Sequence, residues 1–475
     1  MLKALMLVPP TFGRFDNVGA RCQGTRRTKS LWYPIWLAQA VANTPGAKLY
    51  DAAATEATVE ETLELARNFD VIMIHPSEGS LPLDALFAQR LKTLSKQCKI
   101  IFGGQSATVL ANQILENYHW VDSVAIDEYD ETIKEIVTSG SLNVRGSLQR
   151  DTPFEPREKP QDLDALGWVT PIYNRDLDVK RYYLPFVTRP YLQIYDSRGC
   201  TARCTFCLTP QVFTNEHATL KKSNPIRYRS VDDVLNEMSW IKCEMPNIKE
   251  VFIDSDTFTD RANVVSGRFK EICKGLKAVG LKWSCNVRAD ANAEILETLK
   301  QSGCRLIVVG YESVDDNILR GIKKGISSAQ AERFTNEAEK RNLMIQACFI
   351  VGLPGETWRS VDRTFKFALK HNFNNIQVAP AHAFKGTELY RTVENAGYLH
   401  TQLLDVKGRQ LPQISQPQFS AEETANAIEL FLRGFLYRPR YVYRLLKDIA
   451  RGDGELERII RNIREYSKDI IQRGI

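Results

Sequence analysis

The chain has 475 residues, of which 43% are hydrophobic and 25% charged, and its formal net charge is +6. That length suffices for two or three domains, each with its own core. The mild charge does not by itself indicate nucleic-acid binding, and no apolar run is long enough to cross a membrane. The first apolar run, residues 4–8, is too short for a signal peptide. Ten cysteines without paired spacing favour a reducing, cytoplasmic location.

Residues 1–140 alternate short apolar runs with helical patterns. Strands are expected at 2–8, 48–50, 71–75, 99–102 and 123–126, and helices at 33–42, 59–68, 83–95, 109–117 and 131–137. This alternation predicts a Rossmann-like, doubly wound α/β domain that binds a ligand beyond the carboxyl ends of its parallel strands. No G-x-G-x-x-G sequence is present, which argues against a nicotinamide cofactor.

The periodicity fades over residues 141–188, where prolines gather, and this stretch predicts a linker. Six strand–helix units follow within residues 189–397. Their strands are expected at 191–195, 249–254, 282–286, 305–309, 345–350 and 375–379, with helices near 231–243, 263–278, 292–302, 328–341 and 358–370 and a last one after Gly386. Six units rather than eight predict a partial (β/α)6 barrel of the TIM type, with its chemistry at the carboxyl ends of the strands.

Three cysteines follow the first barrel strand at C-x3-C-x2-C spacing: Cys200, Cys204 and Cys207. Three thiolates on one loop suit three corners of a cubane iron–sulfur cluster, whose fourth iron then stays open to a small molecule. The alternative is a structural zinc site, which needs a fourth ligand. His217 is the nearest candidate, although its spacing from the cysteines is unusual for zinc.

The cysteine motif, with Phe206 before its last cysteine, resembles the radical S-adenosylmethionine (radical SAM) superfamily. In that family a 4Fe–4S cluster binds SAM through its open iron and cleaves it with one electron. The resulting 5′-deoxyadenosyl radical takes a hydrogen atom from an unactivated carbon. The resemblance therefore implies a cluster, SAM and an external one-electron reductant of the flavodoxin or ferredoxin type.

The ends of the later barrel strands carry further pieces of that resemblance. Acidic residues after the second strand would face the SAM amino group, and an amide and a guanidinium after the third would meet the ribose and the carboxylate. The fourth strand ends in a G-x-E-S sequence and the fifth runs into G-L-P-G-E-T, where close glycines would admit the adenine. The SAM-binding residues implied are Phe206, Asp254, Asp256, Asn286, Arg288, Glu312, Val351 and Gly352.

The first domain resembles the cobalamin-binding domains that precede some radical SAM domains, through the sequence GGQSAT at 103–108. The two glycines would let a ligand approach the backbone, and Thr108 would cap the next helix. The cobalamin-binding residues implied are Ser77, Ser80, Gly103, Gly104, Gln105 and Thr108. The alternative is a Rossmann-like domain that holds no ligand.

No residue of a D-x-H-x-x-G motif is expected to reach the cobalt, because Ala53 stands where that histidine would be. His75 could contact the metal instead, or bond to a neighbouring loop. The long loop 9–32 carries four arginines, which would cover the corrin, meet the substrate, or form a solvated basic loop: Arg14, Arg21, Arg26 and Arg27.

Within this class the chain resembles proteins associated with hopanoid lipid biosynthesis, at residues 31–34, 207–211, 256–260, 283–286 and 321–325. That resemblance implies a radical ring contraction of an amino-sugar group on a hopanoid-like polyol. The alternative reaction is C-methylation of an unactivated carbon through methylcobalamin. The candidate substrate residues are Gln377 and His382. His382 begins a segment, His-Ala-Phe-Lys-Gly-Thr, that departs from the P-Y-P-G-T sequence common in the family. Two other classes considered are a non-catalytic cobalamin or SAM sensor and a zinc-binding interaction protein.

Residues 398–475 are expected to form a helical domain whose first part is basic, with aromatic residues interleaved. Such a stretch could lie at the periphery of an anionic inner-membrane face, which would suit a lipid substrate. Alternatively, it packs on the barrel with a solvated basic face.

Overall fold

The computed structural model describes residues 1–10, 30–209, 226–400, 403, 410–450, 456, 459, 460 and 464. The chain forms two compact units. The first comprises residues 1–183, 211–228 and 406–409, and the second comprises 184–210, 229–405 and 410–475. None of the helices in the described part is long and apolar enough to span a membrane.

The first unit is built on a six-stranded sheet in the order β2-β1-β3-β4-β5-β6. Its parallel strands are β1 (Ala4–Val8), β2 (Lys48–Asp51), β3 (Val71–Ile74), β4 (Lys99–Gly103) and β5 (Ser123–Ala125). The expected Rossmann-like α/β arrangement is therefore confirmed. An antiparallel edge strand, β6 (Ser147–Leu148), was not anticipated, because two residues show no periodicity.

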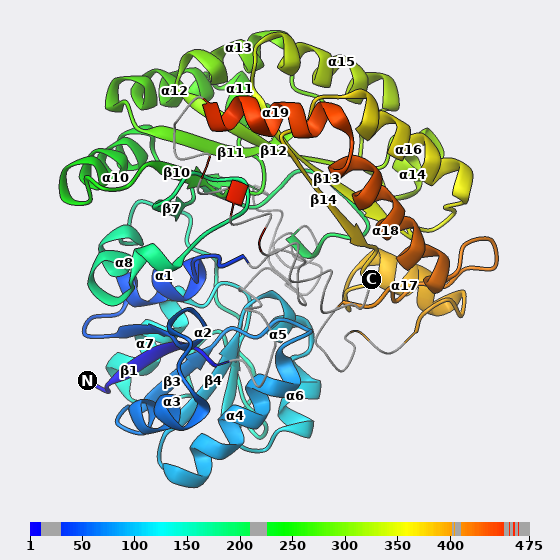
Figure 1. Ribbon diagram of the computed structural model, residues 1–475. Helices are drawn as coiled ribbons and strands as arrows, with labels where there is room; N and C mark the ends of the chain where they lie inside the picture. The colour runs from blue at the N-terminus through cyan, green and yellow to red at the C-terminus, as the bar shows by residue number, and fades with distance from the viewer. Residues whose placement is uncertain are drawn as a thin grey trace. The chain divides into compact units, whose positions relative to one another are not determined.

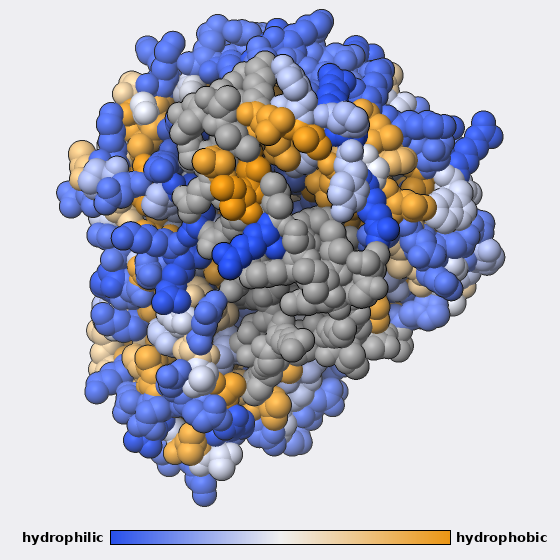
Figure 2. All heavy atoms as spheres, in the orientation of Figure 1, coloured by the Kyte–Doolittle hydropathy of each residue, from blue (hydrophilic) through white to orange (hydrophobic). Residues whose placement is uncertain are grey.

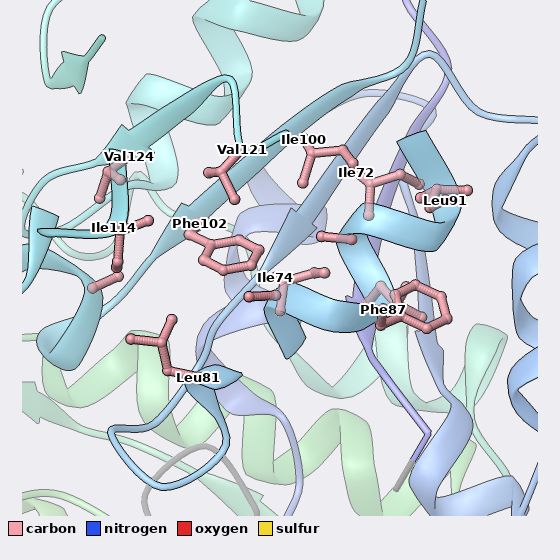
Figure 3. Close-up of a cluster of buried hydrophobic side chains, with 14 of the residues drawn as sticks. Ile72, Ile74, Leu81, Phe87, Leu91, Ile100, Phe102, Ile114, Val121 and Val124 are labelled. Atoms are coloured by element: carbon pink, nitrogen blue, oxygen red, sulfur yellow. The ribbon is translucent and has the colours of Figure 1, made fainter. Parts of the chain in front are cut away.

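Helices flank this sheet (Figure 1). They are α1 (Ile35–Asn43), α2 (Ala52–Thr55), α3 (Val59–Ala66), α4 (Leu81–Leu94), α5 (Gln105–Val109), α6 (Ala111–Asn117) and α7 (Asp130–Ser139). The side chains of β3 and β4 gather with Phe87 and Leu91 of α4 in one apolar cluster (Figure 3). The inner strands are buried on both faces, which explains why they appear in the sequence as continuous apolar runs.

The segment expected to be a linker packs against the first unit up to residue 183. It contains α8 (Thr170–Asp176) and the 3₁₀ helix η1 (Val179–Arg181). The Leu49 amide donates to Asp176 at 2.9 Å, and the Tyr182 hydroxyl donates to the buried Asp51 carboxylate at 2.8 Å. The segment is therefore part of a folded unit. Side-chain contacts of this kind leave no periodic pattern in the sequence and could not be predicted from it. The two-residue strand β9 (Arg227–Tyr228) also belongs to this unit.

The second unit is a curved parallel sheet of six strands in the order β14-β13-β12-β11-β10-β7. The strands are β7 (Tyr191–Ile194), β10 (Glu250–Ile253), β11 (Lys282–Arg288), β12 (Cys304–Glu312), β13 (Met344–Val351) and β14 (Asn375–Pro380). Consecutive strands are neighbours throughout, and each crossover between them carries a helix, so the predicted partial barrel is confirmed.

Helices line the outer side of this sheet (Figure 1). They are α10 (Val231–Glu244), α11 (Arg261–Val265), α12 (Arg268–Val279), α13 (Ala293–Gln301), α14 (Asp316–Gly321), α15 (Ser328–Lys340), α16 (Trp358–Lys370) and α17 (Glu388–Asn395), and the short strand β8 (Ser197–Arg198) follows β7. Side-chain caps begin several of these helices soon after a strand ends. Asp260, Asp315 and Thr357 each accept hydrogen bonds from the first turn of the following helix. These caps fix where each strand-end loop stops.

The C-terminal region contributes α18 (Ala421–Leu436) and α19 (Pro439–Ala450) to the second unit. Arg438 donates to the carbonyls of Ala368, Leu369 and His371, at the carboxyl end of α16. Arg440 and Arg444 donate to the next carbonyls, those of Lys370 and Asn372. Carbonyls at the end of a helix lack partners within the helix, and cations there are stabilising. These arginines therefore hold the tail on the barrel, in place of the solvated basic face considered above.

Candidate functional site

The three cysteines lie on the loop after β8. Gly199, with φ +104°, turns the chain into this loop, a conformation that favours glycine. The loop is held at its middle, because the Thr205 amide donates to the Ile322 carbonyl at 3.0 Å and its own carbonyl accepts from the Leu389 amide at 2.9 Å. Cys200, Cys204 and Cys207 are free thiols. The backbone thus presents all three sulfurs from one anchored loop.

The pKa of Cys200 is raised to about 11 and that of Cys207 to about 12; burial is the largest cause in both, and the Asp256 charge acts in the same direction. For Cys204, burial is again the largest effect, and Lys324 and Arg288 oppose it by lowering the pKa. Thiolates in such a place need a strong cationic partner, as an iron cluster provides. Among the described residues, no three His, Cys, Asp or Glu side chains are grouped as a single metal ion requires. His217, the fourth ligand considered for zinc, lies outside the described residues.

Asp254, expected to accept from an ammonium group, joins three neighbouring strands. One carboxylate oxygen accepts from the Asn286 side-chain amide at 2.9 Å, and the other accepts from the Gln193 amide at 2.6 Å. Asn286 also donates to the Ser255 carbonyl at 2.8 Å. Asp254 therefore orients Asn286 at the strand ends. The sequence did not indicate Gln193, because a single amide inside a buried strand carries no motif.

Asp256 lies beside the cysteine loop. One of its carboxylate oxygens accepts from the Thr209 hydroxyl at 3.2 Å, and its charge raises the pKa of both Cys200 and Cys207. Thr209 was not among the expected site residues. The contact places an acidic side chain next to the cysteines, where a positively charged ligand group would be favoured.

Glu312 ends β12 with φ +61° and pairs with Lys324, whose Nζ lies 2.7 Å from Glu312 Oε1. Both side chains are about nine-tenths buried. Arg288 donates to the Lys324 carbonyl at 2.8 Å and to Asp290 at 3.2 Å. The end of β11, the end of β12 and the loop after α14 are thereby tied together. Lys324 was not among the expected site residues.

The loop after β13 is held by hydrogen bonds from one of its own side chains and from a side chain of the C-terminal region. The Glu356 carboxylate accepts from the amides of Gly352 and Leu353; its pKa is raised to about 8 by burial, against the lowering effect of those bonds. Gln416, in the C-terminal region, accepts from the Gly355 amide at 2.7 Å and donates to the Leu353 carbonyl at 3.0 Å. Val351 and Gly352 were expected to meet adenine: Val351 ends β13, and Gly352, with φ +91°, begins the braced loop.

Phe206 packs at the edge of a small apolar cluster that includes Ile318, Leu353 and Leu389. The substrate candidates lie at the sixth strand: Gln377 is within β14, and His382 follows it. The His382 ring is buried, with Nδ1 3.3 Å from the Gln410 side-chain amide and its centroid 4.1 Å from that of Phe384. Phe206, Gln377 and His382 all belong to the second unit.

In the first unit, the glycine pair after β4 makes room for side chains of the protein itself. A Cβ on Gly103 would lie 2.5 Å from Met73 Cε, and one on Gly104 would lie 2.2 Å from His75 Nε2. Side chains of the protein thus explain why glycine is needed at both positions, and the part of these glycines in ligand binding stays a prediction. His75 Nδ1 is 2.8 Å from the Tyr129 hydroxyl, which matches the alternative of a histidine bonded to a neighbouring loop.

Ser77 and Ser80 form a reciprocal turn that begins α4. Each backbone amide donates to the other's hydroxyl, at 2.9 and 3.1 Å. The Ser80 hydroxyl also donates to Asp84 at 2.7 Å; burial raises the pKa of this carboxyl to about 7, and the Ser80 bond opposes the rise. This turn follows β3, at the point where the sheet order reverses between β1 and β3, which is where sheets of this order bind ligands.

The loop 103–108 lies one strand further along. Gln105 begins α5, and the Thr108 hydroxyl accepts from the Asp127 amide at 2.8 Å. Thr108 therefore does not cap the next helix as expected. It ties α5 to the loop after β5, because it sits within the helix rather than before it. The four arginines of loop 9–32 lie outside the described residues.

Part of the chain, including the cysteine loop and the strand ends, matches a family model. Residues 194–368, from β7 to α16, match the model of the radical SAM superfamily. An uncharacterized methyltransferase of Pyrococcus horikoshii is 26% identical over 480 residues, which cover 98% of each chain. The chain spans less than half the length of the next two curated relatives, both methyltransferases.

Two solved structures resemble the chain in fold. The cobalamin-dependent S-adenosylmethionine radical enzyme OxsB, with aqua-cobalamin and S-adenosylmethionine bound, gives a TM-score of 0.68 at 13% identity, covering 98% of this chain and 72% of that one. The radical S-adenosylmethionine methyltransferase TsrM from Kitasatospora setae, with cobalamin and a [4Fe-4S] cluster bound, gives 0.60 at 14% identity, covering 85% and 80%.

Proposed function

We propose that this chain, whose residues 194–368 form a radical SAM domain, is a cobalamin-dependent radical SAM enzyme that methylates an unactivated carbon. The observation that carries the proposal is the anchored three-cysteine loop beside the Asp254–Asn286 and Glu312–Lys324 pairs at the strand ends. The full-length match to a methyltransferase supports the choice of reaction. Methylation, which was the alternative on sequence alone, is therefore preferred here to ring contraction.

In this proposal Cys200, Cys204 and Cys207 hold a 4Fe–4S cluster. The bound cofactors would supply a 5′-deoxyadenosyl radical and a transferable methyl group. Arg288 would bind the SAM carboxylate, and Asn286, held by Asp254, would bind the ribose. Val351 at the end of β13 and Gly352 in the braced loop would receive the adenine. The protein's own contribution is to fix these groups before SAM arrives, so that little ordering is needed on binding.

The first unit would hold cobalamin at the β1/β3 reversal of its sheet. The Ser77–Ser80 turn and the loop 103–108 offer hydroxyl, amide and backbone groups suited to the corrin side-chain amides. His75 is bonded through Nδ1 to Tyr129 and fills the space over Gly104. The polar groups of the turn and of the loop therefore suit cobalamin. The similarity in fold to two cobalamin-bound structures supports this assignment.

Ring contraction of an amino sugar on a hopanoid-like lipid is the second candidate. It is favoured by the sequence similarity to hopanoid-associated proteins at residues 31–34 and 321–325. In this reaction Gln377 and His382 would meet the substrate. The departure of residues 382–387 from the family sequence leaves methylation the better supported reaction.

An external flavodoxin- or ferredoxin-type reductant is part of the proposal, and so is a small or lipid-linked substrate. Contact with an anionic membrane surface would use α19, whose outer residues include the exposed Val442, Tyr443 and Leu446. Figure 2 shows apolar residues on the surface where Figure 1 draws this helix. Failure to co-sediment with anionic vesicles at low salt would rule this contact out.

Metal analysis tests the proposal against a zinc-binding protein. Protein purified without oxygen and supplied with cobalamin is expected to carry about four iron and four sulfide per chain and about one cobalt. Zinc in place of iron and sulfide would contradict the enzyme assignment. A cluster without bound cobalt would contradict the cobalamin part alone.

A further inference from the structure

Two consecutive lysines, Lys323 and Lys324, occupy opposite environments. Lys323 reaches Glu388 at 2.7 Å, and its side chain is 53% exposed. Lys324 reaches Glu312 at the same distance, but its side chain is only 9% exposed. A buried ion pair loses most of its hydration, so its presence beside the cysteine loop calls for a specific reason.

The backbone around this buried pair is shaped to accommodate it. A Cβ on Gly310 would lie 2.5 Å from Glu312 Oε1 and 3.1 Å from Lys324 Nζ, so the glycine leaves room for both groups. The register between β12 and β13 shifts between Gly310 and Glu312. Lys323 and Gly325, on either side of Lys324, have φ values of +52° and +73°. Such conformations are costly for a lysine, which indicates that the surrounding contacts impose them.

The same loop supports the cysteine loop. The Thr205 amide, next to Cys204, donates to the Ile322 carbonyl at 3.0 Å, and Arg288 donates to the Lys324 carbonyl at 2.8 Å. Lys324 lies two residues from Ile322, and its ammonium is 2.7 Å from the Glu312 carboxylate, so the buried pair is held next to the cysteine loop.

We propose that the Glu312–Lys324 pair sets the reduction potential of the cluster held by the cysteine loop. This inference rests on the proposed function. Reduction adds one electron, taken from the external reductant, and makes the cluster more negative without forming or breaking a bond. A nearby cation stabilises the reduced state, and a nearby anion destabilises it. The two charges therefore act on the cluster in opposite directions: Lys324 makes it easier to reduce, and Glu312 makes it harder to reduce.

The test is a redox titration of the reconstituted cluster without SAM, followed by its electron paramagnetic resonance signal. Lys324→Gln is expected to lower the reduced-to-oxidised ratio at a fixed potential by up to about tenfold, which for one electron corresponds to about 59 mV. Glu312→Gln is expected to raise this ratio. Lys323→Gln, which removes the neighbouring surface charge, leaves it unchanged, and Lys324→Arg restores the parent value.

Opposite shifts in the two buried variants are the decisive result, because a loosened loop would move both potentials the same way. Shifts of equal sign, or no difference from Lys323→Gln, overturn the inference. If Lys324→Gln does not fold, Lys324→Met and Glu312→Gln still provide the two directions. A parent protein that assembles no cluster contradicts the proposed function, whereas an assembled cluster with the same potential in every variant contradicts this inference alone.

Discussion

Cys204→Ala is expected to abolish SAM cleavage and to remove most of the iron, because two thiolates on one loop no longer hold three corners of a cluster. The side chain is small and lies on a loop tied by backbone bonds at Thr205, so the free energy of unfolding should fall by only about 1 kcal/mol. Iron and sulfide content, 5′-deoxyadenosine formation and chemical unfolding measure the three effects. We expect the same loss for Cys200 and Cys207.

Cys273→Ala is the matched control for this variant. Cys273 is a buried thiol in α12, within the apolar core of the same unit. Its replacement should cost a similar free energy of unfolding while iron content and SAM cleavage persist. A Cys204→Ala protein that keeps its iron and cleaves SAM at the parent rate would refute the assignment of the cysteine loop.

Gly104→Ala should have the second-largest effect, this time on the first unit. The residue has φ +96°, and its new Cβ would meet the His75 ring at 2.2 Å. The strained backbone should lower the free energy of unfolding by about 1–3 kcal/mol. Displacing His75 from Tyr129 would disturb the strand ends, and a loss of about 1.4 kcal/mol in binding would weaken cobalamin retention about tenfold. Equilibrium dialysis with hydroxocobalamin measures that retention.

Gly140→Ala is the control that separates backbone strain at a positive φ from a side-chain contact such as that with His75. Gly140 also has a positive φ, +76°, but a Cβ there would meet nothing within 4 Å. This variant should lose stability through backbone strain while cobalamin retention stays at the parent level. Equal losses of cobalamin in both glycine variants would mean that the strand-end loop has no special part in binding.

The strands were predictable because each is marked by an apolar run in its own local sequence. The inner strands of the first unit are buried on both faces, so their apolar runs stand out, and β10–β14 recur at regular intervals with helices between them. The segment 141–183 was not recognised, because it is held by individual side chains such as Asp176 and Tyr182 rather than by a periodic face. The tail arginines were misjudged for the same reason, since their partners are carbonyls at the end of α16.

In the site, too, features that depend on local sequence were predictable, whereas contacts between distant elements were not. Cysteine spacing indicates a cluster because three ligands from one loop depend on local sequence alone. The partners of Asp254 and Glu312 come from elements distant in sequence, and only the fold brings Gln193 and Lys324 to them. The two glycines after β4 stand out in the sequence, but their neighbours Met73 and His75 are visible only in three dimensions.

Product stoichiometry distinguishes methylation from radical rearrangement. Cluster and cobalamin would be reconstituted without oxygen, and SAM, a reductant and an amino-sugar hopanoid supplied. Equal amounts of 5′-deoxyadenosine and S-adenosylhomocysteine, with a lipid heavier by one CH₂, are the predicted result for a methyltransferase. Deoxyadenosine without homocysteine product, together with a lipid isomeric with the substrate, would contradict methylation and establish a radical rearrangement such as ring contraction.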